Sequence, residues 1–409
     1  MSARPFVRVA YSVGLMATAL CVSQAQEPRE ALTYEDALAA ALRANPDVRL
    51  ARIGFDSSRA ELRIARTYPN PVFQANPNTP FQYNATLPID LGPQRTFRVR
   101  AGVLGARAAA DDVADAERQL GVAVAHAFAD VLLADAEFLV SAHRREGVLL
   151  LQQGDATRAR AGDISERALT RSEIELTRAD ADLARASIDR QTTRVALGAL
   201  MGMATPDTGL AVSGSLAYHA VTLDYDELVA QALRARPDVQ ATRVREEQSR
   251  ALLGLARSAV IPIPQVTYSR QFSGPFESGH YYALGIGFEV PLANQYGGQR
   301  DRAAAGAEAS SLVRRRLEAQ VRRDVLDAVI NLRTQGALIE RYEAGLLQKV
   351  QANVEATRYA YSKGATSLLD LMDALRTQQE VASEYQKALH DHVVSRRVLE
   401  GRIGTPVTR

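Results

Sequence analysis

Two carboxylates near the carboxyl end are the first candidates for a functional site. Asp370 and Asp373 lie three residues apart in the run Ser367-Leu368-Leu369-Asp370-Leu371-Met372-Asp373. In a helix this spacing places both side chains on one face. The pair is either part of an ordinary solvated helix surface or, if three chains meet around an axis, a ring of six carboxylates.

Patterns typical of catalysis or metal binding are missing from the sequence. It contains no Gly-x-Ser-x-Gly, no His-Glu-x-x-His and no phosphate-binding loop. Of the six histidines, His390 and His392 are two residues apart, which places them about 200° apart around a helix. We therefore expect no enzyme activity, no metal site and no cofactor.

The elements that carry the carboxylates are two long runs without proline, from Gln94 to Thr205 and from Leu292 to Thr405. All sixteen prolines lie outside these runs, and a proline within a helix costs roughly 3 kcal/mol. Each run is broken once, at Gly162 and at Gly364. The runs predict two antiparallel helical hairpins of the coiled-coil type, at about 94–202 and about 299–404. Residues 300–361 are expected to form one unbroken helix of roughly 90 Å.

An internal repeat relates the two halves of the chain. Leu32–Val48 reads LTYEDALAAALRANPDV, and Leu223–Val239 reads LDYDELVAQALRARPDV. The two segments align with each other without a gap. The predicted helical turns and the hairpin ends also match. We therefore divide the chain into a first repeat, 26–222, and a second repeat, 223–409.

Between the helices of each repeat, the hydrophobic period changes from 3.6 to 2, which predicts β-hairpins at about 72–89 and about 265–290. In the second hairpin, the even-numbered residues are mostly apolar, with Arg270 as the exception. Small or polar residues on one face and apolar residues on the other match a transmembrane β-strand. A half-buried hairpin of a soluble protein is the alternative.

The amino terminus has the features of a secretory signal peptide, residues 1–25. Arg4 and Arg8 precede an apolar stretch, and Ser23-Gln24-Ala25 supplies a cleavage site. A lipid anchor at Cys21 is disfavoured because Leu20 precedes it. The remaining chain would have no cysteine and would carry 47 basic and 47 acidic residues, which leaves no basic footprint for nucleic acid.

Four strands cannot close a barrel, and an open sheet edge is forbidden in lipid. The barrel must therefore be shared between chains. Two chains give eight strands, whose interior is filled by side chains, whereas three give twelve and leave an opening. A homotrimer is the smallest channel.

Together these features resemble the TolC-like outer-membrane efflux family. Residues 87–95, LPIDLGPQR, are most similar to the heavy-metal (Czc-type) branch, although that branch commonly ends this turn with Gly-Lys-Arg. The resemblance implies a mainly α-helical chain with membrane β-strands. Three chains would form a 12-stranded β-barrel continued by a long periplasmic α-helical barrel. The implied partners are outer-membrane lipid, a periplasmic adaptor and an inner-membrane pump of the RND type.

The resemblance also implies roles for single residues. Asp370 and Asp373 would line the closed periplasmic aperture, and the first repeat, with Ala168 and Arg171 at these positions, would not add to the ring. The turn residues Arg160, Gly162, Ser165, Tyr361, Gly364 and Ser367 would form the adaptor-docking tips. Simple helix-turn chemistry explains these residues equally well. A family carboxylate that pairs with Tyr361 falls at Ala168, which predicts that this contact is lost.

The sequence therefore predicts a passive exit channel of a tripartite efflux system in the bacterial outer membrane, with heavy-metal cations as cargo. A duct for drug efflux or for type I protein secretion has the same sequence features. A periplasmic adaptor protein also carries a long helical hairpin, but the duplication and the membrane-like strands argue against it.

Overall fold

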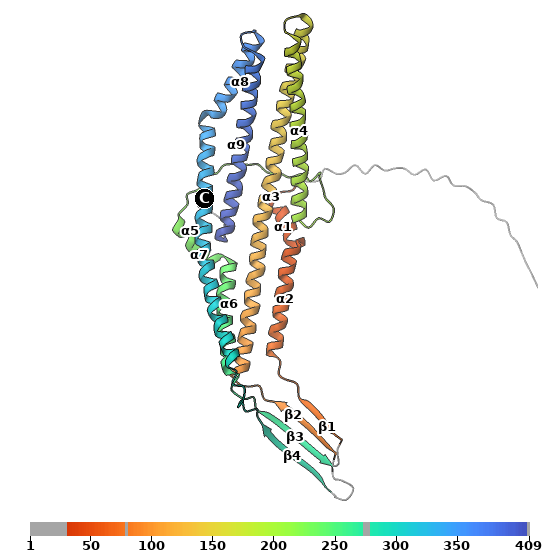
Figure 1. The fold of residues 1–409 in the computed structure, drawn as a ribbon, viewed down its shortest axis with the longest axis vertical. Coiled ribbons are helices and arrows are strands. Elements are labelled where there is room, and N and C mark those ends of the chain that lie inside the picture. The colour runs from red at the N-terminus through yellow and green to blue at the C-terminus, as the bar shows by residue number, and fades with distance from the viewer. Residues whose placement is uncertain (1–30, 78–80, 273–278, 407–409) are drawn as a thin grey trace, which may run out of the picture.

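The computed structural model of the chain describes residues 31–77, 81–272 and 279–406. The expected signal peptide and Cys21 lie outside the described residues. The order of elements is the same in both halves: two helices, two strands and a long helical hairpin. The strands lie at one end of an elongated molecule and the turns of the two helical hairpins lie at the other (Figure 1).

Each half begins with a pair of helices whose boundary is set by proline. In the first half these are α1 (Tyr34–Ala44) and α2 (Pro46–Arg66), and in the second half α5 (Tyr225–Ala235) and α6 (Pro237–Ser258). Thr33 and Asp36 cap α1 reciprocally, and the Asp224 side chain caps α5. Proline occupies the first position of α2 and α6, where its missing N–H costs no hydrogen bond.

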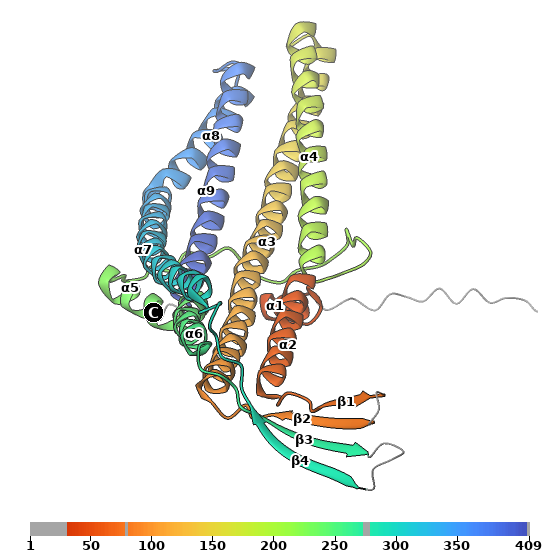
Figure 2. The ribbon, with the colours of Figure 1, turned by 60° about the horizontal axis from the view of Figure 1, so that its bottom comes forward.

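The four described strands form one antiparallel sheet in the order β1-β2-β3-β4. They are β1 (Val72–Asn76), β2 (Gln82–Pro88), β3 (Gln265–Phe272) and β4 (His280–Gly287). The two repeats join through β2 and β3, where Pro88 pairs with Gln265 and Gln82 with Gln271. The expected alternation up to Val290 is longer than β4, which ends at Gly287. The strands lie side by side and extend away from the helices (Figure 2).

The long helices are α3 (Pro93–Ala161) and α4 (Glu166–Leu200) in the first half, and α7 (Gly297–Arg341), α8 (Leu347–Ser362) and α9 (Leu368–Ile403) in the second. At 69 residues, α3 reaches roughly 100 Å without interruption. No described helix has the combination of length and apolar character needed to cross a membrane.

The prediction of one unbroken helix over 300–361 is wrong. A π-helical turn, η1 (Tyr342–Leu346), separates α7 from α8, and Gly345 within it has a φ of 122°. Leu346 is exposed, whereas Tyr342 is buried. The Tyr342 hydroxyl donates to Glu384 Oε2 at 3.0 Å, and Tyr385 of α9 donates to Glu343 Oε1 at 2.8 Å. The widened turn lets two consecutive residues reach α9.

Two equivalent hydrophobic clusters, one in each half, form the core where the short helices meet the long ones. Each contains a fully buried leucine from the end of its helical hairpin, Leu197 in the first half and Leu399 in the second. Each also contains the valine that follows the helix-starting Pro-Asp, Val48 or Val239. The duplication seen in the sequence thus produces two copies of one packing unit.

Candidate functional site

The turn between α3 and α4 is the first of the two hairpin tips. Gly162 adopts a left-handed conformation with a φ of 83°, and the N–H of Asp163 donates to the carbonyl of Arg158 at 2.9 Å. Ser165 then begins α4, its hydroxyl accepting from the N–H of Ala168 at 3.3 Å. Arg160 is exposed and bonds only the Ala156 carbonyl of its own helix. The turn leaves the Arg160 side chain available on the surface.

The turn between α8 and α9 is built in the same way but carries an additional carboxylate. Gly364 has a φ of 71°, and Ser367 begins α9. The hydroxyl and the N–H of Ser367 both donate to Asp370 Oδ2, at 2.6 and 3.0 Å, and Thr366 donates to the same oxygen at 2.8 Å. These hydrogen bonds lower the pKa of Asp370, because they favour its charged form.

Asp370 and Asp373 therefore lie on the first two turns of α9, but they do not act as an isolated pair. One oxygen of Asp370 caps the helix, and Asp373 Oδ1 accepts from Arg376 Nη2 at 2.7 Å. Both side chains of this ion pair are exposed. Asp370 is the better anchored negative charge of the two, because three donors hold it in place.

The side chain of Tyr361 crosses from the second hairpin to the first. Its hydroxyl donates to Asp155 Oδ1 at 2.7 Å, and the Arg158 guanidinium lies over its ring at 5.2 Å. Burial and the hydrogen bond to Asp155 raise the pKa of Tyr361 to about 12. The prediction that Tyr361 has lost its partner, which placed the partner at Ala168, is wrong: Asp155 of α3 takes that place.

Asp155 could have been found from a seven-residue period along α3. Ala134, Ser141, Val148 and Asp155 are each seven residues apart, and all four are buried. A heptad repeat keeps one seam of a helix facing its partner. Asp155 thus places a carboxylate on a helix seam whose other three members are also buried. Asp155 is only 1% exposed, and its Oδ2 has no hydrogen-bond partner among the described residues.

Further polar contacts join α3 to α9 between the core and the tips. Arg118 Nη1 donates to the Gly401 carbonyl at 2.7 Å, His390 Nε2 lies 2.8 Å from Asp130 Oδ1, and Ser383 Oγ donates to Glu137 Oε2 at 2.7 Å. With Tyr361 and Asp155, they form four cross-links between the two hairpins. Each pairs residues that are more than 200 positions apart in the chain.

The histidines take part in one of these cross-links. His390 also contacts Asp391 Oδ1 at 2.9 Å, and His126 contacts the second oxygen of Asp130 at 2.9 Å. Burial lowers the pKa of His390, but the hydrogen bonds with Asp130 and Asp391 outweigh it and raise the pKa. Among the described residues, no group of three or more His, Cys, Asp or Glu could hold a metal ion. His390 therefore links α9 to α3 through Asp130.

A sequence model of the outer membrane efflux protein family matches residues 228–405. The cobalt-zinc-cadmium resistance protein CzcC of Cupriavidus metallidurans is 25% identical over 368 residues, which cover 88% of this chain and 87% of CzcC. The chain is therefore similar to the outer membrane efflux protein family. Members of this family are passive channels rather than enzymes, and they extend from the outer membrane into the periplasm.

Solved structures share the fold of this chain. The MtrE outer membrane channel of Neisseria gonorrhoeae, in its open state, gives a TM-score of 0.75 at 20% identity, covering 92% of this chain and 90% of MtrE. The outer membrane protein VceC of Vibrio cholerae gives 0.77 at 17% identity, covering 92% and 97%. The α-helical and β-barrel architecture expected from the sequence is confirmed at the level of the fold.

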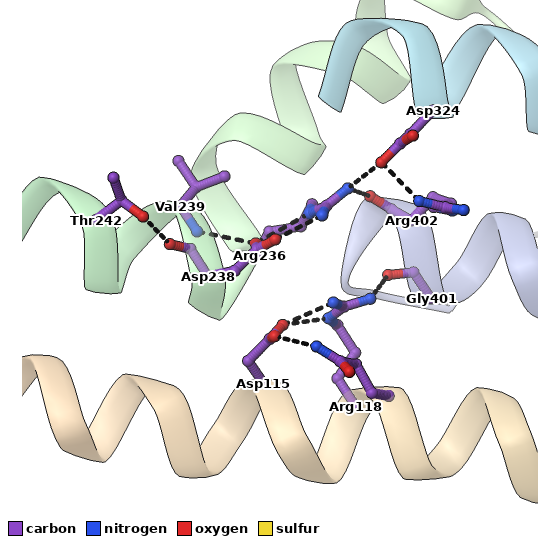
Figure 3. Close-up of polar contacts among 10 residues, drawn as sticks. Asp115, Arg118, Arg236, Asp238, Val239, Thr242, Asp324, Gly401 and Arg402 are labelled. Atoms are coloured by element: carbon purple, nitrogen blue, oxygen red, sulfur yellow. Dashed lines mark hydrogen bonds and ion pairs between the residues drawn. The ribbon is translucent and has the colours of Figure 1, made fainter. Parts of the chain in front are cut away.

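A buried cluster of ion pairs and hydrogen bonds joins the two helical hairpins of the chain near their base (Figure 3). Arg236, at the start of α6, has a side chain only 5% exposed and pairs with Asp238 at 2.6 Å and with Asp324 of α7 at 3.5 Å. Asp324 also receives Arg402 of α9 at 2.6 Å. Arg118 joins the same region from α3, paired with Asp115. Helices α3, α6, α7 and α9 are thus held at one point.

In the first repeat, an uncharged side chain makes the equivalent contact. Asn45 occupies the position of Arg236, and its side-chain amide donates to the Leu200 carbonyl at 3.2 Å. Arg236 donates to the Arg402 carbonyl at 3.4 Å, which is the equivalent place in the second repeat. The sequence showed the repeat, but it did not show that Asn45 and Arg236 play equivalent roles. Nothing in either segment alone indicates which side chain becomes buried.

Proposed function

We propose that this protein is the exit channel for heavy-metal cations in a tripartite efflux system. The observation that carries the proposal is the similarity to the cobalt-zinc-cadmium resistance protein CzcC over 88% of the chain. The Czc-type turn of residues 87–95 agrees with it. Asp90 of this turn is buried and bonds Arg98 of α3 at 2.5 Å, which ties the sheet to the helices.

The working form in this proposal is a homotrimer. Among the described strands, β1 and β4 are the outer ones, and each pairs with a described strand on one side only. Open strand edges cannot face hydrocarbon, because their N–H and C=O groups would lose hydrogen bonds. Pairing β4 of one chain with β1 of the next closes twelve strands in three chains. The twelve-stranded barrel would continue into a barrel of long helices in the periplasm.

A periplasmic adaptor and an inner-membrane pump of the RND type complete the proposed system. The adaptor would dock on the tips, which carry Arg160, Gly162 and Ser165 on one turn and Tyr361, Gly364 and Ser367 on the other. A groove of about 900 Å³ runs between α4 and α9 behind these tips. Its lining includes the exposed apolar side chains of Ile174 and Leu369 among arginines and carboxylates. Apolar side chains with a charged rim are typical of protein interfaces.

In a trimer, Asp370 and Asp373 would place six carboxylates around the axis at the tips. A ring of carboxylates favours cations over anions. Substitution by asparagine tests this role, because the asparagine side-chain oxygen could still accept the capping hydrogen bonds while the charge is removed. The D370N/D373N double variant in a planar bilayer should lose cation selectivity. D163N, which removes an exposed charge from the other tip, should keep it.

The cargo is tested by deleting the gene and growing the cells on divalent and monovalent heavy metals, dyes and antibiotics. Sensitivity to metals alone, restored by the wild-type chain, is the expected result. Sensitivity only to organic compounds would assign the channel to drug efflux instead. No sensitivity, together with loss of a secreted protein from the medium, would assign it to type I secretion.

A further inference from the structure

We propose that Arg270 binds the phosphate group of an outer-leaflet lipid, with lipid A as the lipid that supplies it. The proposal rests on the placement of the sheet in the outer membrane and is independent of the cargo. Within the four described strands, Arg270 is the only Lys, Arg, Asp or Glu. A single charge in such a sheet needs a physical reason.

The strand register places Arg270 on the apolar face. Residues paired across an antiparallel sheet project to the same side, and Arg270 pairs with Tyr83 of β2 and Tyr282 of β4. The same face carries Phe73, Leu87, Val266, Tyr268, Leu284 and Ile286. The opposite face carries glutamine, asparagine, serine and threonine, and the hydroxyls of Thr86 and Thr267 meet there at 3.1 Å.

The apolar face is open in a single chain: Leu284 and Ile286 are each 76% exposed. In a barrel this is the side that meets lipid, because a polar face lines the lumen. Arg270 is therefore a guanidinium on a lipid-facing surface. Charge at the membrane centre costs about 2–4 kcal/mol for arginine in a barrel and falls to nearly nothing at the interface.

Arg270 lies toward the interface at the far end of the strands. It is the third residue from the end of β3, on the side away from the helices. An aromatic cluster surrounds this level of the sheet. The rings of Phe81 and Tyr83 are 4.7 Å apart, and those of Tyr83 and Phe272 are 5.7 Å apart. Aromatic rings gather at the level of the lipid headgroups.

The guanidinium is held in place but its hydrogen bonds are not used. It lies 4.5 Å from the ring centroid of Phe272 and 5.5 Å from that of Tyr282. Among the described residues, its buried Nε has no hydrogen-bond partner and no acidic residue forms an ion pair with Arg270. Stacking between two rings orients the planar group and leaves its Nη donors, rather than the buried Nε, for a ligand. A phosphate matches this donor pattern and can accept two parallel hydrogen bonds.

Arg270 lies toward the end of the sheet that faces away from the helices, so the phosphate would come from a lipid of the outer leaflet. The helices continue into the periplasm from the other end of the sheet, so Arg270 lies near the external surface. A phosphorylated glycolipid in that leaflet presents its phosphate at the depth of the aromatic cluster.

The experiment uses the full chain, purified and freed of lipid, and measures lipid A binding by native mass spectrometry. We expect R270Q to weaken binding roughly tenfold or more. R270K should weaken binding less, because lysine keeps the charge but cannot form two parallel hydrogen bonds with the phosphate. R49Q, which removes an exposed arginine from α2, should bind like the wild type. Phosphatidylcholine and fully dephosphorylated lipid A serve as comparison lipids.

Equal binding of lipid A by R270Q and wild type would overturn the proposal. So would an equal loss in R49Q, since binding would then reflect net charge, or equal binding of dephosphorylated lipid A. A drop in trimer stability of R270Q without lipid would instead assign Arg270 to a contact between chains. Circular dichroism of each variant in detergent checks that the fold is retained.

Discussion

Tyr361 of α8 donates a hydrogen bond to Asp155 of α3 at 2.7 Å, and this bond joins the tips of the two helical hairpins. Asp155 is buried, and Tyr361 provides the only hydrogen bond to its carboxylate recorded among the described residues. The bond is the cross-link nearest the tips, so we predict that it controls how far they separate.

Replacing Tyr361 by phenylalanine should favour separated tips. The variant removes one hydroxyl and leaves a buried carboxylate unpaired, at a cost of about 1–3 kcal/mol. We expect a higher single-channel conductance in planar bilayers. Y359F is the matched control, because Tyr359 lies on the same helix and is 67% exposed. Equal conductance of Y361F and wild type would show that the bond does not limit opening.

The same bond should be insensitive to pH in the physiological range. The pKa of Tyr361 is raised from 10 to about 12, so the contribution is complete below pH 10 and is lost as the pH rises toward 12. The conductance difference between wild type and Y361F should therefore be constant from about pH 6 to about pH 9. A difference that disappears within this range would contradict the assignment of the proton to the tyrosine.

His390 should make the free energy of unfolding depend on pH, and it should do so at lower pH than Tyr361. Because its pKa is raised above 6.5, its contribution is complete below pH 6.5 and is lost as the pH rises through the raised value. The free energy of unfolding of the wild type relative to H390Q should be larger at acidic than at alkaline pH. Denaturant unfolding at both pH values measures it. H143Q, at an exposed histidine of α3, is the matched variant for comparison.

The two repeats should differ in how much their equivalent joints contribute. R236A leaves Asp238 without its main partner and weakens the set around Asp324, at a cost of about 3–5 kcal/mol. N45A removes the hydrogen bond to Leu200 and should cost about 1–2 kcal/mol. Denaturant midpoints of the two variants measure the difference. Equal losses of stability would mean that the ion pairs of Arg236 add nothing to the hydrogen bond that Arg236 and Asn45 each donate to a carbonyl at the end of a hairpin.

Close packing of α3 against α9 gives a prediction that involves no polar group. A Cβ at Gly401 would overlap the side chain of Val122, so G401A should destabilise the protein by about 1–3 kcal/mol. G147A provides the control, because no atom lies within 4 Å of a Cβ there. It should be neutral or stabilising by up to about 1 kcal/mol, as alanine favours helix. Thermal unfolding of both variants tests the pair.

Much of the fold follows from local sequence rules. Proline-free runs gave the two helical hairpins, and Gly162 and Gly364 marked their turns, because a left-handed residue is cheapest for glycine. Alternating side chains identified the strands, and Arg270 already stood out as the exception. Each of these rules depends on residues within a few positions of one another, so the sequence alone contains the information.

The contacts that join the hairpins were decided only by the tertiary structure. Tyr361 and Asp155 are 206 positions apart, and their meeting depends on how two long helices are offset along their axes. The π-helical turn at Tyr342–Leu346 likewise depends on which residues of α9 lie opposite. Arg236 and Asn45 occupy equivalent positions yet use different chemistry, because Asp324 is available to one and not the other. Local propensity fixes the elements, and packing between distant elements fixes their partners.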